Sequence, residues 1–283
     1  MKIKQVFNNN VISALDNYEN ELIIKGKGLG FMKKPGDNVA EENIEKIFTN
    51  ENQDTSKQLT NLLEEVPLQI IEISDEIIQL AKLTLGKELN DIIYVSLTDH
   101  IHYAIERHKD GMNIKNGLLW EISNIYQEEY TIGKKALEII EAHTSIQLPD
   151  DEAGFIAHHI VNAELNEEMT NVVNITKVTQ EVLNIVKYHF NIQFDRTTLA
   201  HHRFVTHLKF FAQRLFRGIR GVDRDEFLYQ IVKEKHSNAY ACTEKIALFI
   251  KKTYSYTISK DEMLYLTIHI ERVVSQQTLT DRY

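Results

Sequence analysis

The feature that most restricts the fold of this chain is a histidine-centred pattern that occurs twice, about one domain length apart. His100 and His207 are each followed seven residues later by an arginine, Arg107 and Arg214. The two histidines are 107 positions apart in a chain of 283 residues. A period of this length indicates a duplicated domain rather than the short units of a solenoid repeat.

A second histidine follows in each copy, His159 in the first and His269 in the second. Both come after an Asp-Glu pair that begins eight residues earlier, at positions 151 and 261. These two histidines are 110 positions apart, so the two offsets agree. Each copy therefore carries two histidines in matching settings, and this favours a regulatory protein over one with a single catalytic centre.

The first fifty residues differ from the rest of the chain in their pattern of apolar and turn-forming residues. Short runs of β-favouring residues alternate there with turns rich in Asn and Gly, which predicts a small antiparallel sheet of about four strands. Three of these runs can be placed, at Val6–Phe7, Val11–Ile12 and Leu22–Ile24. From about residue 56 apolar residues recur at helical spacing, and the whole chain contains only three prolines.

The resulting prediction is a multidomain α+β protein in which a small N-terminal antiparallel β-sheet is followed by two homologous all-α helical bundles. We place the sheet domain at residues 1–56 and the two bundles at residues 66–169 and 171–276. A sheet of this size has a marginal core, so dimerisation would help to stabilise it.

Capping signals suggest where some of the helices begin and end. Ser74–Glu76 resembles a helix start, with Gly86 as the end of that helix, and Thr131–Gly133 precedes another helix. Pro149–Glu152 opens the helix that contains His159, because acidic residues are favoured in the first turn.

Charge and cysteine content limit the class of protein. The chain has a net charge of −9, whereas residues 1–34 contain six lysines and only three acidic residues. A small basic module on an acidic body is compatible with a polyanion-binding N-terminus, but not with a protein that grips nucleic acid over its whole surface. A single cysteine, Cys242, and the absence of a signal peptide or a membrane-spanning run predict a cytoplasmic protein without membrane insertion.

The N-terminal module contains a second group of candidate residues, Asn8–Asn10 and Lys25–Phe31. They could be ordinary hairpin turns. They could also bind RNA, because glycines allow close backbone approach, lysines neutralise phosphates and asparagine amides read base edges. Phe31 offers a flat face for an unpaired base, so a structured RNA with splayed bases would suit this module better than a long duplex.

The paired histidines admit three functions. Metal binding is disfavoured, because the extra donors His102 and His158 are replaced by Lys209 and Ile268 in the second copy. Acid–base catalysis would need a carboxylate such as Asp99 or Asp151 to orient an imidazole, and no nucleophile or cofactor motif accompanies them.

Reversible phosphorylation of the imidazoles fits the duplicated pattern best. The added charge would repel acidic neighbours or recruit Arg107 and Arg214. We count Asp99 with these arginines as a residue that supports the phosphosites. No catalytic residue, metal site or cofactor is predicted.

Several segments together resemble the BglG/SacY/LicT family of bacterial transcriptional antiterminators, and most of all its LicT-like members, the antiterminators of β-glucoside operons. The resemblance extends from the N-terminus through Ser275. It rests on the segments NNNVIS, GKGLGFMKKPGD, VSLTDHI, DEAGFIAHHIVNAELN, RFVTHLKFFAQRLF and EMLYLTIHIERV.

The resemblance implies an N-terminal co-antiterminator domain that binds a leader-mRNA hairpin as a homodimer and so prevents premature termination. The RNA contacts would fall on Asn10, Gly26, Lys27, Gly28 and Phe31, with Lys4, Asn8 and Asn9 as further candidates. Family members often carry arginine at the position of Lys27, and lysine lacks its bidentate geometry.

The resemblance also implies two regulatory domains controlled by the sugar phosphotransferase system. The phosphorylated residues would be His100 and His159 in the first domain and His207 and His269 in the second. A sugar-specific permease, the enzyme II of the system, would inactivate the protein through the first domain, and the phosphocarrier protein HPr would activate it through the second. The alternatives are a His-rich helical metalloenzyme and a DNA-binding activator with the same regulatory domains.

Overall fold

The computed structural model describes residues 1–7, 9–16, 21–48, 62, 65–167, 169–219 and 226–280, without the side chains of 277–280. The chain divides into two compact units. One comprises Met1–Leu119 with Tyr126–Asn166, and the other comprises Trp120–Ile125 with Glu167–Tyr283.

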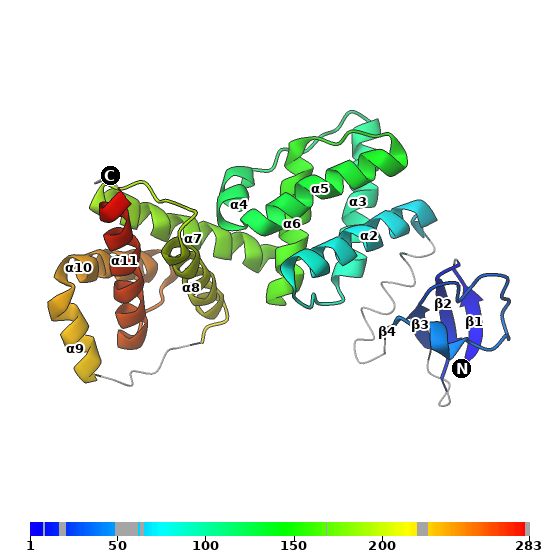
Figure 1. Cartoon of the computed structure of the whole chain (residues 1–283), viewed down its shortest axis with the longest axis horizontal. Coiled ribbons are helices and arrows are strands. Elements are labelled where there is room, and N and C mark those ends of the chain that lie inside the picture. Colours follow the sequence, from blue (N-terminus) through cyan, green and yellow to red (C-terminus); the bar gives the residue numbers. More distant parts are fainter. Residues whose placement is uncertain are drawn as a thin grey trace. The chain divides into compact units, whose positions relative to one another are not determined.

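The N-terminal part is a four-stranded antiparallel sheet in the order β1-β2-β3-β4 (Figure 1). Its strands are β1 (Lys2–Val6), β2 (Val11–Leu15), β3 (Glu21–Lys25) and β4 (Lys46–Phe48). The predicted small antiparallel sheet is confirmed. β1 begins earlier than the predicted run, because Lys2 and Lys4 alternate with the buried Ile3 and so fit a half-buried strand. The fourth strand, β4, had no predicted location.

The sheet is apolar on both faces. Ile12 and Ile24 are fully buried and pack with Leu29 in the small core of the sheet. Val11 and Ile23 belong to the larger apolar cluster of the same unit. This alternation follows from the period of two along a strand, and it holds the strands in register.

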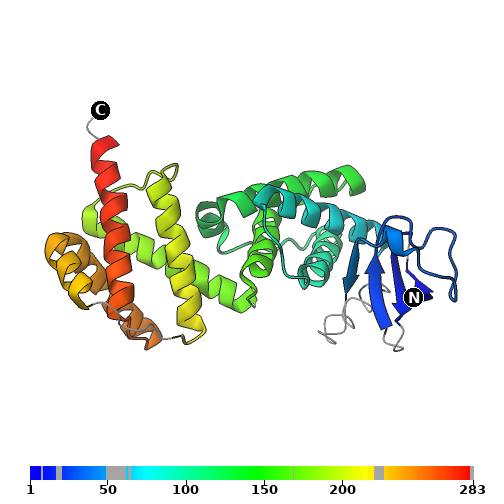
Figure 2. The same cartoon turned by 60° about the horizontal axis from the view of Figure 1, so that its bottom comes forward.

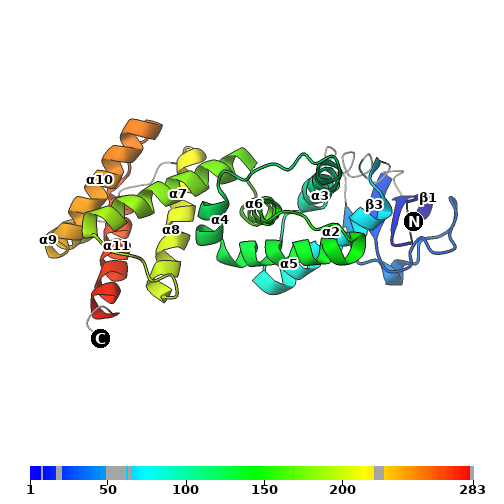
Figure 3. The same ribbon diagram turned by 90° about the horizontal axis from the view of Figure 1, so that it is seen from above.

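Beyond the sheet, the described residues up to 166 form a series of helices. They are α2 (Leu68–Leu85), α3 (Ile93–Lys109), α4 (Leu119–Ile125), α5 (Gln127–Thr144) and α6 (Asp150–Leu165). In Figure 3, α3 and α6 are seen nearly end-on beside each other, with α2 and α5 running across them. The prediction that the chain is helical beyond the sheet is confirmed.

Two of the predicted helix starts are wrong. Ser74 lies inside α2, which begins at Leu68 after Pro67, and its Oγ donates to the carbonyl of Ile70 at 2.7 Å. Serine can satisfy its hydroxyl inside a helix in this way, so it need not mark a helix start. Gly86 does end α2, in the left-handed conformation at φ 62°.

The segment Thr131–Gly133 lies within α5 rather than before it. Gly133 is required by packing, because a Cβ atom there would come within 2.2 Å of the carbonyl oxygen of Ala153 on α6. Glycine thus lets these two helices approach closely. Pro149 is the N-cap of α6, as predicted.

The second unit contains α7 (Met169–Phe190), α8 (Leu199–Phe216), α9 (Glu226–Lys235), α10 (Ser237–Tyr254) and α11 (Lys260–Thr280). Figure 2 shows α8, in yellow, beside α11, in red, and the two helices pack against each other. Cys242 is fully buried, and burial raises the pKa of its thiol to about 12. None of the helices in the described ranges has the length and apolar character needed to cross a bilayer.

Candidate functional site

The structure brings the two predicted histidines of each copy into ring contact. The ring centroids of His100, on α3, and His159, on α6, are 4.9 Å apart, with 40° between the ring planes. His207, on α8, and His269, on α11, are stacked with a centroid distance of 4.7 Å and an angle of 24°. His100 and His207 lie in the middle of their helices.

A buried glutamate lies next to the first histidine of each pair. Nε2 of His100 is 2.9 Å from Oε2 of Glu152, although the two atoms are not aligned for a hydrogen bond. Nε2 of His207 is 3.9 Å from Oε2 of Glu262. Only 2% of Glu152 and 7% of Glu262 are exposed, so each imidazole faces a carboxylate that water scarcely reaches.

The predicted arginines bind these glutamates. Nη2 of Arg107 is 3.4 Å from Oε1 of Glu152. Arg214 donates from Nε to Oε1 of Glu262 at 2.8 Å, and its Nη2 is 2.6 Å from the same oxygen. Each copy therefore contains two imidazoles and a carboxylate–guanidinium pair on two packed helices.

Asp99 and Asp151 do not occupy the position expected of a carboxylate that orients His100. Asp99 has an exposed side chain on α3. Asp151 accepts from the backbone N–H of Asn116 at 2.7 Å and pairs with Lys115 at 3.1 Å. Glu152 takes this position instead.

Sequence reasoning did not assign a role to Glu152 or Glu262. A signal was available, because each lies seven residues before the second histidine. Two turns of helix place such residues on the same face.

Burial keeps several of these imidazoles neutral at pH 7. It lowers the pKa of His159 to about 3, with smaller contributions from His100 and His158. It lowers the pKa of His207 to about 4, assisted by His269 and Arg214. A neutral imidazole has a free lone pair, which a nucleophile needs.

Acid should destabilise the first unit, because His158 is only 4% exposed and burial lowers its pKa to about 4. Between that value and the ordinary pKa of about 6.5, the unfolded chain binds more protons than the folded one, so stability falls as the pH falls. We expect the parent protein to lose more free energy of unfolding than His158→Ile when the pH is lowered from about 7.5 to about 5. The difference between the two losses should be about 2 kcal/mol.

This change introduces the residue found at the equivalent position of the second copy, Ile268. Urea unfolding at a series of pH values measures the effect. The matched control is His202→Asn, at an exposed histidine, which should retain the acid sensitivity of the parent protein. Identical pH profiles for the parent and His158→Ile would contradict the prediction.

In the sheet domain, backbone hydrogen bonds join the asparagine turn to the glycine-rich loop. Gly26 N–H donates to the carbonyl of Asn10 at 2.8 Å, and Gly30 N–H donates to that of Asn9 at 2.9 Å. The side-chain oxygen of Asn10 accepts from Gly28 N–H at 2.9 Å. We call this group the loop cluster, and it consists of Asn9, Asn10, Gly26, Lys27, Gly28 and Phe31.

The loop cluster presents an aromatic ring and a lysine to solvent. Phe31 is 59% exposed, and Lys27, four residues earlier in the chain, is also exposed. Gly28 has φ 71°, which favours glycine there. Lys4 pairs with Glu21 on β3, and Asn8 lies outside the described residues.

Comparison with known proteins matches the chain to two domain families. Residues 1–57 match the CAT RNA binding domain, and residues 75–163 and 180–273 each match the PRD domain. The chain is 57% identical over 276 residues to "Transcription antiterminator LicT" of Bacillus subtilis, covering 98% of this chain and 100% of that protein. It is 49% identical to "Beta-glucoside operon antiterminator" of Dickeya chrysanthemi, covering 98% of each protein.

A solved structure supports the same assignment for the N-terminal part. The crystal structure of GlcT CAT-PRDI matches with a TM-score of 0.51 and 36% sequence identity. The match covers 58% of this chain and 97% of the solved one.

Proposed function

Because the chain belongs to the transcription antiterminators built from a CAT RNA binding domain and PRD domains, we propose how its own residues bind RNA and control that binding. The protein is an RNA-binding transcription antiterminator, regulatory rather than enzymatic. Residues 1–57 match an RNA-binding family, and this argues against both the metalloenzyme and the DNA-binding activator.

In this proposal the loop cluster is the surface that contacts the leader-mRNA hairpin. The observation that supports it is the exposed side chain of Phe31 next to a loop whose backbone is held by hydrogen bonds to Asn9 and Asn10. An exposed aromatic face can stack on an unpaired base, and Lys27 can neutralise a phosphate. A homodimer would present two such surfaces to one hairpin. A hairpin held in this way would prevent the overlapping terminator hairpin from forming.

The four paired histidines are the proposed switch. A neutral imidazole in each pair would accept a phosphoryl group of the sugar phosphotransferase system, from the permease in the first PRD and from HPr in the second. The observation that carries this assignment is the buried glutamate, paired with a partly exposed arginine, beside each pair of imidazoles.

A phosphoryl group adds about −1.5 to −2 charges, by analogy with phosphoserine. Next to a buried carboxylate that charge is strongly unfavourable, so the two helices must repack. Repacking would bias the dimer between an RNA-binding state and an inactive one.

The test replaces His100, His159, His207 and His269 with alanine and measures read-through in a transcription assay with each phosphoryl donor supplied in turn. We expect read-through by the wild-type protein to change several-fold with the donors, and read-through by the variant to stay constant. The matched control is the pair His102→Ala and His202→Ala on α3 and α8, which should keep the response. A variant that still responds to either donor would refute the switch.

A further inference from the structure

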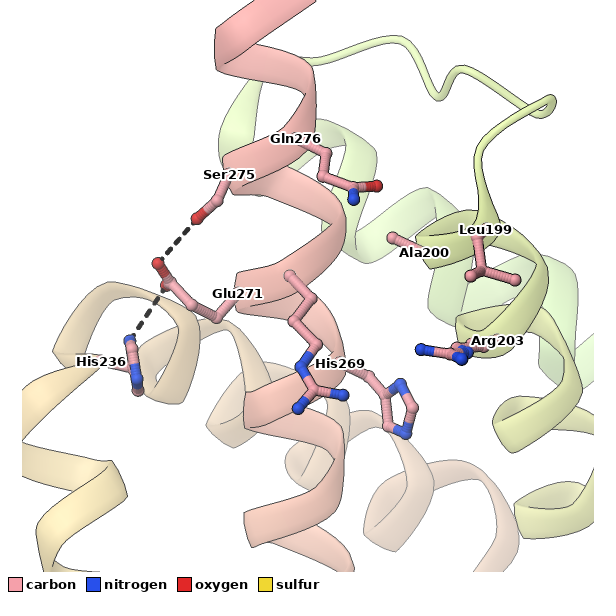
Figure 4. Close-up of a pocket in the computed structure, with 9 residues that line it drawn as sticks. Leu199, Ala200, Arg203, His236, His269, Glu271, Ser275 and Gln276 are labelled. Atoms are coloured by element: carbon pink, nitrogen blue, oxygen red, sulfur yellow. Dashed lines mark hydrogen bonds and ion pairs between the residues drawn. The ribbon is translucent and has the colours of Figure 1, made fainter.

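The second unit contains a cavity with two basic lining residues that are replaced by uncharged residues in the first copy of the pattern. It has a volume of about 530 Å³ and is lined by residues of α8 and α11 and by His236, the N-cap of α10. Arg203, Arg272 and His269 are among its lining residues. Figure 4 shows the side chains of Arg203 and His269 reaching into the same space between the two helices.

The basic groups of this cavity are available to an anion. Its one acidic lining residue, Glu271, is already engaged by His236 at 3.5 Å and by Ser275 at 2.9 Å. Within the described part of the chain, neither Arg203 nor Arg272 forms an ion pair with a carboxylate. Both side chains are exposed.

The two guanidinium groups also act on the histidine. The pKa of His269 is lowered by burial and further by Arg272 and Arg203. Two cations close enough to disfavour a positive charge on the ring must, by the same interaction, favour a negative charge placed there. The cavity is therefore electrostatically poised for an anion attached to this imidazole.

The first copy lacks both arginines. With the offsets of 107 and 110 positions, Arg203 corresponds to Ser96 and Arg272 corresponds to Asn162. The imidazoles themselves are duplicated, so the difference is confined to their surroundings. A feature present in only one copy points to a property that distinguishes the two domains.

We infer that Arg203 and Arg272 form a receptor for the phosphoryl dianion carried by His269, a site that the first PRD does not possess. The inference deepens the proposed function and rests on it, since it takes His269 as a phosphoryl acceptor. Guanidinium groups bind phosphoryl oxygens through paired, charge-assisted hydrogen bonds. A phosphoryl group on His269 therefore meets compensating charge, whereas one on His159 does not meet these arginines.

The covalent step balances without a further reactant. A lone pair on neutral His269 forms a P–N bond, and the P–N bond of a phosphorylated donor histidine breaks with its electron pair staying on the donor nitrogen. With the chemical donor phosphoramidate, the P–N bond breaks toward the amine, which leaves as ammonia. In both cases the transferred group keeps its three oxygens, and the proton released from the other ring nitrogen of His269 balances the proton taken up by the leaving imidazole or amine.

The test compares the full-length protein with Arg203→Ser/Arg272→Asn, which installs the residues of the first copy. Both proteins are phosphorylated with phosphoramidate, and the signal of His269 is assigned by its loss in His269→Ala. We expect the pKa of the phosphoryl group, followed by ³¹P NMR, to be lower in the wild type by about one unit or more, as for an anion beside cations. Inorganic phosphate should also shift the His269 ring resonances of the wild type, with at least about tenfold weaker binding in the variant.

The matched control is Lys251→Ser/Lys252→Asn, which removes the same charge from exposed positions at the end of α10. It should behave like the wild type. Equal phosphoryl pKa values in the wild type and the arginine variant would overturn the inference. Failure of phosphoramidate to phosphorylate His269, while inorganic phosphate still binds, would also overturn it, because the cavity would then serve a free anion only.

Failure of this inference can be told apart from failure of the proposed switch. If the arginines lower the phosphoryl pKa but read-through ignores the donors, the receptor stands and the switch fails. If read-through responds but the pKa is unchanged by the variant, the switch stands and the receptor fails.

Discussion

Replacing Gly26 with alanine is expected to lower the affinity of the full-length protein for its hairpin RNA by about a hundredfold, or about 2.7 kcal/mol. A Cβ atom at this position would lie 1.9 Å from the backbone carbonyl oxygen of Asn43 and 2.8 Å from Cδ1 of Leu29. The carbonyl belongs to the backbone and cannot move aside as a flexible side chain would. The loop must therefore shift, and with it the hydrogen bond from Gly26 N–H to Asn10.

The affinity of Gly26→Ala is measured by gel shift with the leader hairpin, alongside circular dichroism to show that the helical units persist. The matched control is Gly117→Ala, at an exposed glycine where a Cβ would meet nothing within 4 Å. This control should bind RNA as the wild type does. If Gly26→Ala bound with unchanged affinity, the loop cluster would not be the RNA-binding surface.

The architecture was readable from the sequence because it depends on repeated, redundant signals. Alternation of apolar residues gave the sheet, and helical spacing gave the bundles. β4 was missed because its three residues, Lys46–Phe48, are too few to show a period. It forms because the edge of β3 that faces away from β2 offers backbone groups to pair with, which is a tertiary effect.

Helix boundaries were less readable, because one residue type can serve two purposes. Ser74 resembles a cap yet donates to a carbonyl one turn earlier inside α2. Gly133 resembles a break yet permits α5 to contact α6 at Ala153. Only the neighbouring element distinguishes these roles, and a single sequence does not contain it.

The histidines of the candidate site were readable because duplication marked them. Their surroundings were not, because Glu152 approaches His100 from a different helix, α6. The sequence assigned Arg107 to a future phosphoryl group, whereas in the structure it binds this glutamate. Arg107 can fill both roles only if a phosphoryl group competes with the Glu152 carboxylate for it. The Arg107–Glu152 pair is therefore the interaction to test by mutation.

Replacing Arg107 with methionine is expected to destabilise the first unit by about 3 kcal/mol. The side chain of Glu152 is 3% exposed, so loss of its partner leaves a buried carboxylate without its compensating guanidinium. The expected cost lies at the lower end for broken buried pairs, because the Arg107 side chain is itself 27% exposed and partly hydrated. Methionine keeps the length and apolar stem of arginine, so packing should change little.

Hydrogen exchange read by mass spectrometry localises this loss, since peptides from α3 and α6 should exchange faster while those from α8 and α11 should not. The control is Arg107→Met/Glu152→Gln, which removes both charges and should recover most of the lost protection. A single variant with unchanged exchange would show that the pair contributes nothing to stability. The buried carboxylate 2.9 Å from Nε2 of His100 would then not be the group that transmits a phosphoryl charge into helix packing.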